Sequence, residues 1–159
     1  MSLRARTFGW TITAIVVTLV VGRIAVDPAS GNKLPWALSY EDALRRSAQS
    51  GKPAMVVFSS RGCTWCRKLQ TETFADARVE TAAKQVIPVL VSTDERPDLA
   101  AEYNVTTVPL TVFVDGKANR LDSVGGYVDA DIFAKILVEV SAAAKRGEPV
   151  PGSPRRSIW

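Results

Sequence analysis

Histidine is absent from the 159 residues of this chain, and only two cysteines are present. Without histidine, the chain has no imidazole general base, no Ser-His or Cys-His pair to activate a nucleophile, and no histidine ligand for a metal. Two cysteines alone fall short of the roughly four ligands that a structural zinc ion needs. We therefore expect the chemistry to depend on the two cysteines or on carboxylates, and we expect no bound cofactor.

A basic face on the central part of the chain is also lacking. The net charge of +4 comes from the two ends, since residues 1–27 carry +2 and residues 145–159 carry +3, which leaves −1 between them. A nucleic-acid-binding domain concentrates Lys and Arg on its folded part. No nucleic-acid partner is therefore expected. The length suits one domain with an appendage.

The N-terminal region has the features of a membrane signal. No charge interrupts the stretch Thr7–Gly22, and Arg4 and Arg6 precede it. Continued to Val26, the apolar stretch approaches the roughly 17–25 residues that span a bilayer. Because positive flanks stay in the cytoplasm, we expect residues 1–26 to be a single-pass anchor in the inner (cytoplasmic) membrane. The remainder would then lie in the periplasm or an equivalent extracytoplasmic space.

Two other interpretations of this segment stand beside the anchor. A cleaved signal sequence shares the charged start, but Asp27-Pro28 stands where a small-x-small cleavage site is wanted. A buried core helix is disfavoured by β-branched residues on all sides and by the basic flank. Anchor and signal sequence both place the remaining chain on the same side of the membrane.

The rest of the chain is expected to form a linker at 27–37, one domain at 38–144 and a disordered basic tail at 145–159. Within the domain, buried apolar strands alternate with helices in the first half, and a hairpin and a helix follow. This order predicts an α/β fold with a mixed central sheet flanked by helices. The expected elements are a helix at 40–50, a strand at 53–58, a helix after Cys63, a helix at 79–85, a strand at 86–91, a helix at 97–103, strands at 110–114 and 121–124, and a helix at 129–144.

The two cysteines lie three residues apart in Cys63-Thr64-Trp65-Cys66, between a buried strand and a helix. Unsatisfied N–H groups and the positive end of the dipole at a helix start favour a thiolate on Cys63. One helical turn brings the second sulfur within reach of the first. The pair is therefore predicted to exchange disulfides, with Cys63 as the attacking thiolate and Cys66 as the resolving thiol.

Arg61, Arg67 and Lys68 add positive charge in the sequence around the pair. They either support the thiolate or are ordinary solvated residues, and the sequence leaves this open. A purely structural disulfide is the main competing interpretation of the pair, but a loop this short removes little unfolded-state entropy.

The segments FSSRGCTWCRKL, TFADARV, LAAEYNVTTVPLTVF and VGGYVDADIFAKIL together resemble the thioredoxin superfamily. They are similar to the thioredoxin-like C-terminal domain of transmembrane thiol:disulfide interchange reductases. The resemblance covers about residues 36–142. It implies a thioredoxin fold, and it implies that Pro109 is a cis-proline that packs against the disulfide while Val108 offers its backbone to a bound substrate. From the residues alone, an ordinary trans proline at the start of a strand is the preferred interpretation.

Three departures from the family pattern are visible. Gly62 stands where the family usually has Trp, and Trp65 is expected to supply the apolar cover and to contact substrate. Leu110 replaces the usual Thr. The family's buried Asp and Lys fall on Val57 and Leu90, which removes the group that takes the proton from the second cysteine in thioredoxins.

The leading hypothesis is a membrane-anchored thiol:disulfide oxidoreductase, more a reductase than an oxidase, that acts on protein disulfides and thiols. A reductase outside the cytoplasm needs electrons from across the membrane, so a membrane electron donor or redox partner protein is expected. The alternatives are a non-catalytic binding or chaperone module with the same fold and a metallochaperone that holds a soft ion on two thiolates.

Overall fold

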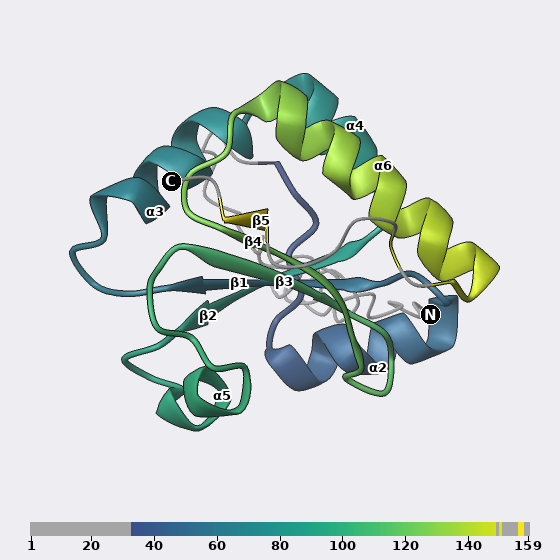
Figure 1. Cartoon of the computed structure of the whole chain (residues 1–159), viewed down its shortest axis with the longest axis horizontal. Coiled ribbons are helices and arrows are strands. Elements are labelled where there is room, and N and C mark those ends of the chain that lie inside the picture. Colours follow the sequence, from purple (N-terminus) through teal and green to yellow (C-terminus); the bar gives the residue numbers. More distant parts are fainter. Residues whose placement is uncertain (1–32, 149, 151–155, 158–159) are drawn as a thin grey trace, which may run out of the picture.

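The computed structural model describes residues 33–148, 150 and 156–157 of the chain. It contains an α/β domain with helices on both faces of one sheet (Figure 1). In chain order the elements are α2 (Tyr40–Ser50), β1 (Ala54–Ser59), α3 (Thr64–Lys68), the π-helix η2 (Leu69–Thr73), α4 (Ala77–Ala83), β2 (Ile87–Ser92), α5 (Pro97–Glu102), β3 (Leu110–Val114), β4 (Arg120–Gly125), α6 (Ala130–Arg146) and β5 (Arg156–Ser157).

The sheet has the order β2-β1-β3-β4-β5. β1 runs parallel to β2 and antiparallel to β3, and β3 and β4 form an antiparallel hairpin. In the β1–β3 register Phe58 lies opposite Leu110. The end of β1 therefore lies beside the start of β3, which brings the segment before Leu110 close to the loop that leaves β1.

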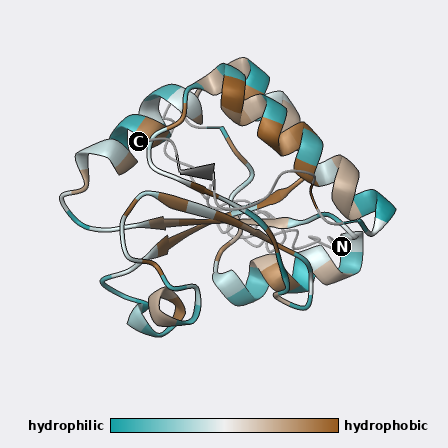
Figure 2. Ribbon diagram, viewed as in Figure 1, coloured by the Kyte–Doolittle hydropathy of each residue, from teal (hydrophilic) through white to brown (hydrophobic). Residues whose placement is uncertain are grey.

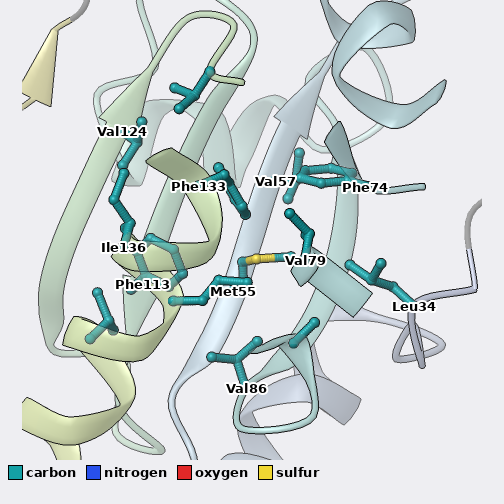
Figure 3. Packing of buried hydrophobic residues seen from close by; sticks show 14 of the residues in the cluster. Leu34, Met55, Val57, Phe74, Val79, Val86, Phe113, Val124, Phe133 and Ile136 are labelled. Carbon is teal, nitrogen blue, oxygen red and sulfur yellow. The ribbon is translucent and has the colours of Figure 1, made fainter. Parts of the chain in front are cut away.

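Two helical layers cover the sheet. α3, α4 and α6 lie over one face, and α2 and α5 lie over the other (Figure 1). Brown apolar residues run along the central strands and alternate with teal residues along α6 (Figure 2). The larger buried cluster joins Met55, Val57 and Phe113 of the sheet to Phe74 and Phe133 of the covering layer (Figure 3). The loop that carries the two cysteines therefore begins at a strand, β1, whose side chains are packed in the core.

Local signals in the sequence account for several element boundaries. Ser39 caps α2, with its hydroxyl accepting a hydrogen bond from the Asp42 N–H at 3.1 Å, and Gly51 ends the helix in the left-handed conformation. The Asp129 carboxylate caps α6 by accepting from the Ile132 N–H at 3.1 Å. Alternating helices and strands fold as expected, and the α/β prediction is confirmed.

The structure corrects two expectations about the body of the chain. Leu90, expected inside a doubly buried strand, is 46% exposed, because β2 is the edge strand of the described sheet. Ile132, expected on the buried stripe of the last helix, is exposed, whereas its neighbour Phe133 is fully buried.

Part of the expected disordered tail at 145–159 belongs to the described structure, whereas residues 149, 151–155 and 158–159 lie outside the described residues. α6 continues to Arg146, Gly147 ends it, and the Val150 side chain is buried. Farther along, Arg156–Ser157 pairs with β4 as the short strand β5. Burial of the apolar Val150 side chain and pairing of Arg156–Ser157 with the edge of the sheet favour contact of these residues with the domain.

The expected anchor at 1–26 lies outside the described residues. Within the part of the chain that the structure describes, no helix is both long and apolar enough to cross a bilayer.

Candidate active site

Cys63 and Cys66 form a disulfide with an S–S distance of 2.04 Å and a Cα–Cα distance of 5.3 Å. Cys63 is the N-cap residue of α3, and its sulfur accepts a hydrogen bond from the Cys66 N–H at 3.1 Å. Its half-buried side chain contrasts with that of Cys66, which is only 3% exposed. An incoming sulfur therefore reaches Cys63 more readily than Cys66.

The turn before Cys63 depends on a glycine. Gly62 has φ of 78°, the left-handed region that costs other residues roughly 1–2 kcal/mol. A tryptophan in its place, as in the family pattern, would be strained in this backbone. Trp65 stands instead inside the motif, and its side chain is 57% exposed.

Asp94, in the loop after β2, is hydrogen-bonded to the turn that precedes Cys63. Its carboxylate accepts a hydrogen bond from the Arg61 N–H at 2.7 Å. A second link joins the loops, since the Thr93 N–H donates to the Ser59 carbonyl at 2.8 Å. The start of the cysteine loop is therefore fixed against the end of β2.

Pro109 follows a cis peptide bond from Val108, as the resemblance to thioredoxins implied. Pro109 is buried and Val108 half-buried. Because Leu110 pairs with Phe58, Pro109 lies beside the end of β1 from which the cysteine loop departs. Its carbonyl accepts from the Gly126 N–H at 2.8 Å, which ties it to the loop after β4.

Two of the three basic residues near the cysteines, Arg61 and Lys68, have acidic neighbours. Arg61 Nε lies 3.9 Å from the Asp94 carboxylate, and Lys68 Nζ lies 3.9 Å from that of Glu72. These partly exposed pairs offset much of the positive charge. A thiolate on Cys63 would therefore be stabilised mainly by the Cys66 N–H and the start of α3.

Within the described residues, no three Cys, Asp or Glu side chains gather as a metal site would require. The arrangement of one accessible and one buried sulfur at a helix start is suited to disulfide exchange.

The model of the thioredoxin-like domain family matches residues 40–141. The chain belongs to this family. Over 104 residues it is 30% identical to the thiol:disulfide interchange protein DsbD of Ralstonia nicotianae, a match that covers 61% of this chain and 17% of that protein. Over 90 residues it is 33% identical to thioredoxin 1 of Synechococcus elongatus, covering 56% of this chain and 80% of that one.

A solved structure supports the same assignment. A thioredoxin from Thermus thermophilus matches with a TM-score of 0.64 and 29% identity, covering 72% of this chain and 93% of its own. This chain thus spans most of a thioredoxin but less than a fifth of the Ralstonia DsbD protein.

Two apolar residues stand where typical thioredoxins have a buried acid and a buried base, and these two residues differ in their exposure to solvent. Val57 is 1% exposed and lies in the buried cluster with Leu69 and Phe74, which follow Cys66 in the chain (Figure 3). Leu90, its register partner on β2, is exposed at the sheet edge. Of these two residues, only Val57 therefore lies in the interior below α3, the helix that begins at the cysteine pair and is called the cysteine helix from here on.

Sequence reasoning missed Asp94, Glu72 and Tyr127. Asp94 lies in the Thr-Asp-Glu-Arg-Pro turn, a composition that favours side-chain hydrogen bonds to backbone, but its partner belongs to another loop. Tyr127 directly follows the Gly125-Gly126 break, and its contacts with the cysteine helix become visible only in the fold.

Removal of the Asp94 carboxylate tests the support of the cysteine turn. We expect Asp94→Ala to lower the free energy of unfolding of the oxidised protein by about 1 kcal/mol, because the Arg61 N–H loses its acceptor at a partly exposed site. Asp94→Asn keeps an acceptor oxygen and is expected to lose less than half of that. Urea unfolding followed by tryptophan fluorescence measures both, and equal stability of Asp94→Ala and the natural protein would contradict this role.

Proposed function

We propose that this chain is a membrane-anchored, extracytoplasmic thiol:disulfide oxidoreductase that reduces disulfides of partner proteins. The observation that carries the proposal is the accessible Cys63 sulfur paired with a buried Cys66 sulfur at the start of α3. Membership of the thioredoxin-like family and similarity to thioredoxin 1 and DsbD proteins support exchange chemistry at this pair.

The proposed reaction has two exchange steps. The Cys63 thiolate attacks one sulfur of a partner disulfide, forms a mixed disulfide and expels the other partner sulfur as a thiolate, which takes up a proton. Cys66 then loses its proton and attacks the Cys63 sulfur, which forms the Cys63–Cys66 disulfide and releases the second partner thiolate. Two electrons pass to the partner, and the oxidised pair seen in the structure is the product.

A return path for electrons completes the proposed cycle. The Cys63–Cys66 disulfide must be reduced again by a dithiol, and in an oxidising compartment that dithiol must receive electrons from across the membrane. We therefore propose a membrane-bound electron donor or redox partner protein. No cofactor enters either exchange step.

A reductase assay tests the activity. The natural protein with excess dithiothreitol is expected to accelerate the reduction of insulin disulfides over dithiothreitol alone, and a Cys63→Ser variant is expected not to. The second candidate, a binding or chaperone module with this fold, is favoured by the apolar Val57 in place of a proton-accepting Asp. Equal rates for the natural protein and Cys63→Ser would select that candidate.

The membrane topology has its own test. An alkaline phosphatase fused after Trp159 is expected to be active in a bacterial host, because Arg4 and Arg6 hold the start of the uncharged stretch inside the cytoplasm. Deletion of residues 7–26 from the same fusion is the matched control and should abolish the activity. The full-length fusion should sediment with membranes; a released, shortened product would indicate a cleaved signal sequence, and an inactive fusion would contradict the topology.

A further inference from the structure

The exposed Trp65 and the half-buried Tyr127 form an aromatic pair beside the cysteines. Their ring centroids lie 5.9 Å apart at an interplanar angle of 46°. The Lys68 Nζ lies 5.3 Å from the Trp65 centroid and 4.7 Å from the Tyr127 centroid. We call Trp65, Tyr127 and Lys68 the aromatic platform. Because Trp65 stands between Cys63 and Cys66, the platform adjoins the reacting sulfurs.

Hydrogen bonds hold the Tyr127 side of the platform in place. The Tyr127 hydroxyl donates to Glu72 Oε2 at 2.9 Å, and this bond raises the pKa of Tyr127 above its ordinary value. The buried Thr73 hydroxyl donates to the Val128 carbonyl at 2.6 Å. Two adjacent residues of η2 therefore fix the loop that carries Tyr127, next to the cysteine helix (Figure 1).

The same loop connects the platform to the cis-proline segment. Gly126, the residue before Tyr127, donates its N–H to the Pro109 carbonyl at 2.8 Å. Contacts thus link α3 through the Trp65–Tyr127 pair and Gly126 to Pro109. An extended partner segment with its sulfur at Cys63 would pass the platform within a residue or two of the reacting cysteine.

Packing within the described domain does not account for the exposure of the Trp65 side chain. Five large apolar side chains of the described chain are exposed, and Trp65 is the one aromatic residue among them. Rigid, partly exposed aromatic side chains are the residue types that contribute most to recognition at interfaces. The Lys68 charge is offset by Glu72 at 3.9 Å, so the platform offers ring surface rather than a net charge.

We infer that the aromatic platform selects partner segments that carry an aromatic or large aliphatic side chain within two residues of the cysteine attacked by Cys63. This inference rests on the proposed function and adds the chemical class of the partner segment. Trp65 and Tyr127 supply the contact surface, while Glu72 and Thr73 are positioning residues that hold Tyr127.

Two peptides of equal length and charge test the inference. Each contains one cysteine as a mixed disulfide with glutathione, flanked on both sides by phenylalanine in one peptide and by serine in the other. The reduced natural protein is expected to react about tenfold faster with the phenylalanine peptide, as an aromatic contact of typical strength predicts. Stopped-flow tryptophan fluorescence or quenched mass spectrometry measures the rate constants.

Four variants separate recognition from folding. Trp65→Ala and Tyr127→Ala should reduce the preference to less than threefold through slower reaction with the phenylalanine peptide, and Trp65→Phe should retain most of it. Val138→Ala, which removes an exposed apolar side chain on α6, is the matched control and should keep the full preference. Thiol alkylation and mass spectrometry of each variant should count no free thiol before treatment with excess dithiothreitol and two after it, which shows that the cysteine pair itself still forms and is reduced.

The outcomes distinguish the inference from the proposed function. Equal rates for both peptides with the natural protein, or an undiminished preference in Trp65→Ala, would overturn the inference and leave disulfide exchange in place. No reaction of the natural protein with either peptide, or with insulin, would overturn the proposed function and with it the inference.

Discussion

A Cys66→Ser variant is expected to accumulate covalent adducts with partner proteins in cells. Cys63 is the accessible sulfur, and Cys66 is the buried group that must release the mixed disulfide. Without the second thiol the intermediate loses its intramolecular exit, so turnover should fall to background while adducts build up. Non-reducing gel electrophoresis after acid quenching measures the adducts, which should disappear when a reductant is added.

The matched control is Cys63→Ser, in which the remaining Cys66 thiol is buried. This variant should trap little, because a partner sulfur reaches it poorly. Adducts of equal abundance in the two variants would mean that the thiols are interchangeable. An absence of adducts in both would shift the interpretation to the non-catalytic binding module.

Replacement of Val57 by Asp is expected to lower the free energy of unfolding by about 3–5 kcal/mol at pH 8, because an unpaired carboxylate would be buried in the cluster with Leu69 and Phe74. Burial raises the pKa of such a carboxyl in the folded state above its unfolded value of about 3.9. The destabilisation should therefore shrink as the pH falls below the folded pKa and grow as the pH rises through it. Urea unfolding at pH 5 and pH 8 measures the difference.

Val57→Asn is the control for this variant, since it adds a polar group of similar shape that does not titrate. Its destabilisation should be the same at both pH values. If Val57→Asp were as stable as the natural protein at pH 8, this position would not be the buried apolar interior that the structure shows. In the folded Val57→Asp protein, a carboxylate below the cysteine helix should accept the Cys66 proton and speed release of the mixed disulfide.

Much of the fold could be predicted because local signals and burial agree. The Ser39 cap and the Gly51 stop define α2 in the sequence and in the structure. The apolar strand before the cysteines and the hairpin around Asp115-Gly116 also lie where the residue pattern predicts. In these segments the preference of each residue and the needs of the core point the same way.

Other features depend on which elements become neighbours, and the sequence does not contain that information locally. Leu90 belongs to an apolar run that favours a buried strand, yet β2 takes the edge of the described sheet. A similar limit applies to Val150, whose burial requires a surface formed by distant residues. The tertiary neighbours of Leu90 and Val150, rather than the local sequence, therefore decide whether each side chain is buried.

The features of the candidate site likewise divide into those that the sequence predicts and those that only the fold reveals. The spacing of Cys63 and Cys66 predicts the pair that the structure joins in a disulfide, and the family resemblance predicts the cis peptide bond before Pro109. The supporting contacts of Asp94 and Tyr127 join residues more than thirty positions apart. Their partners therefore became visible only when the loops were assembled around the end of β1.

The reduction potential of the Cys63–Cys66 pair tests the central claim most directly. The protein is equilibrated with graded dithiothreitol buffers under nitrogen and quenched with acid, and the reduced fraction is counted by thiol alkylation and mass spectrometry. An exchange-active reductase should show a reversible two-electron transition near the value of thioredoxin, about −270 mV. A potential below about −300 mV, in the range of structural disulfides, would contradict the assignment of this pair as a redox-active site.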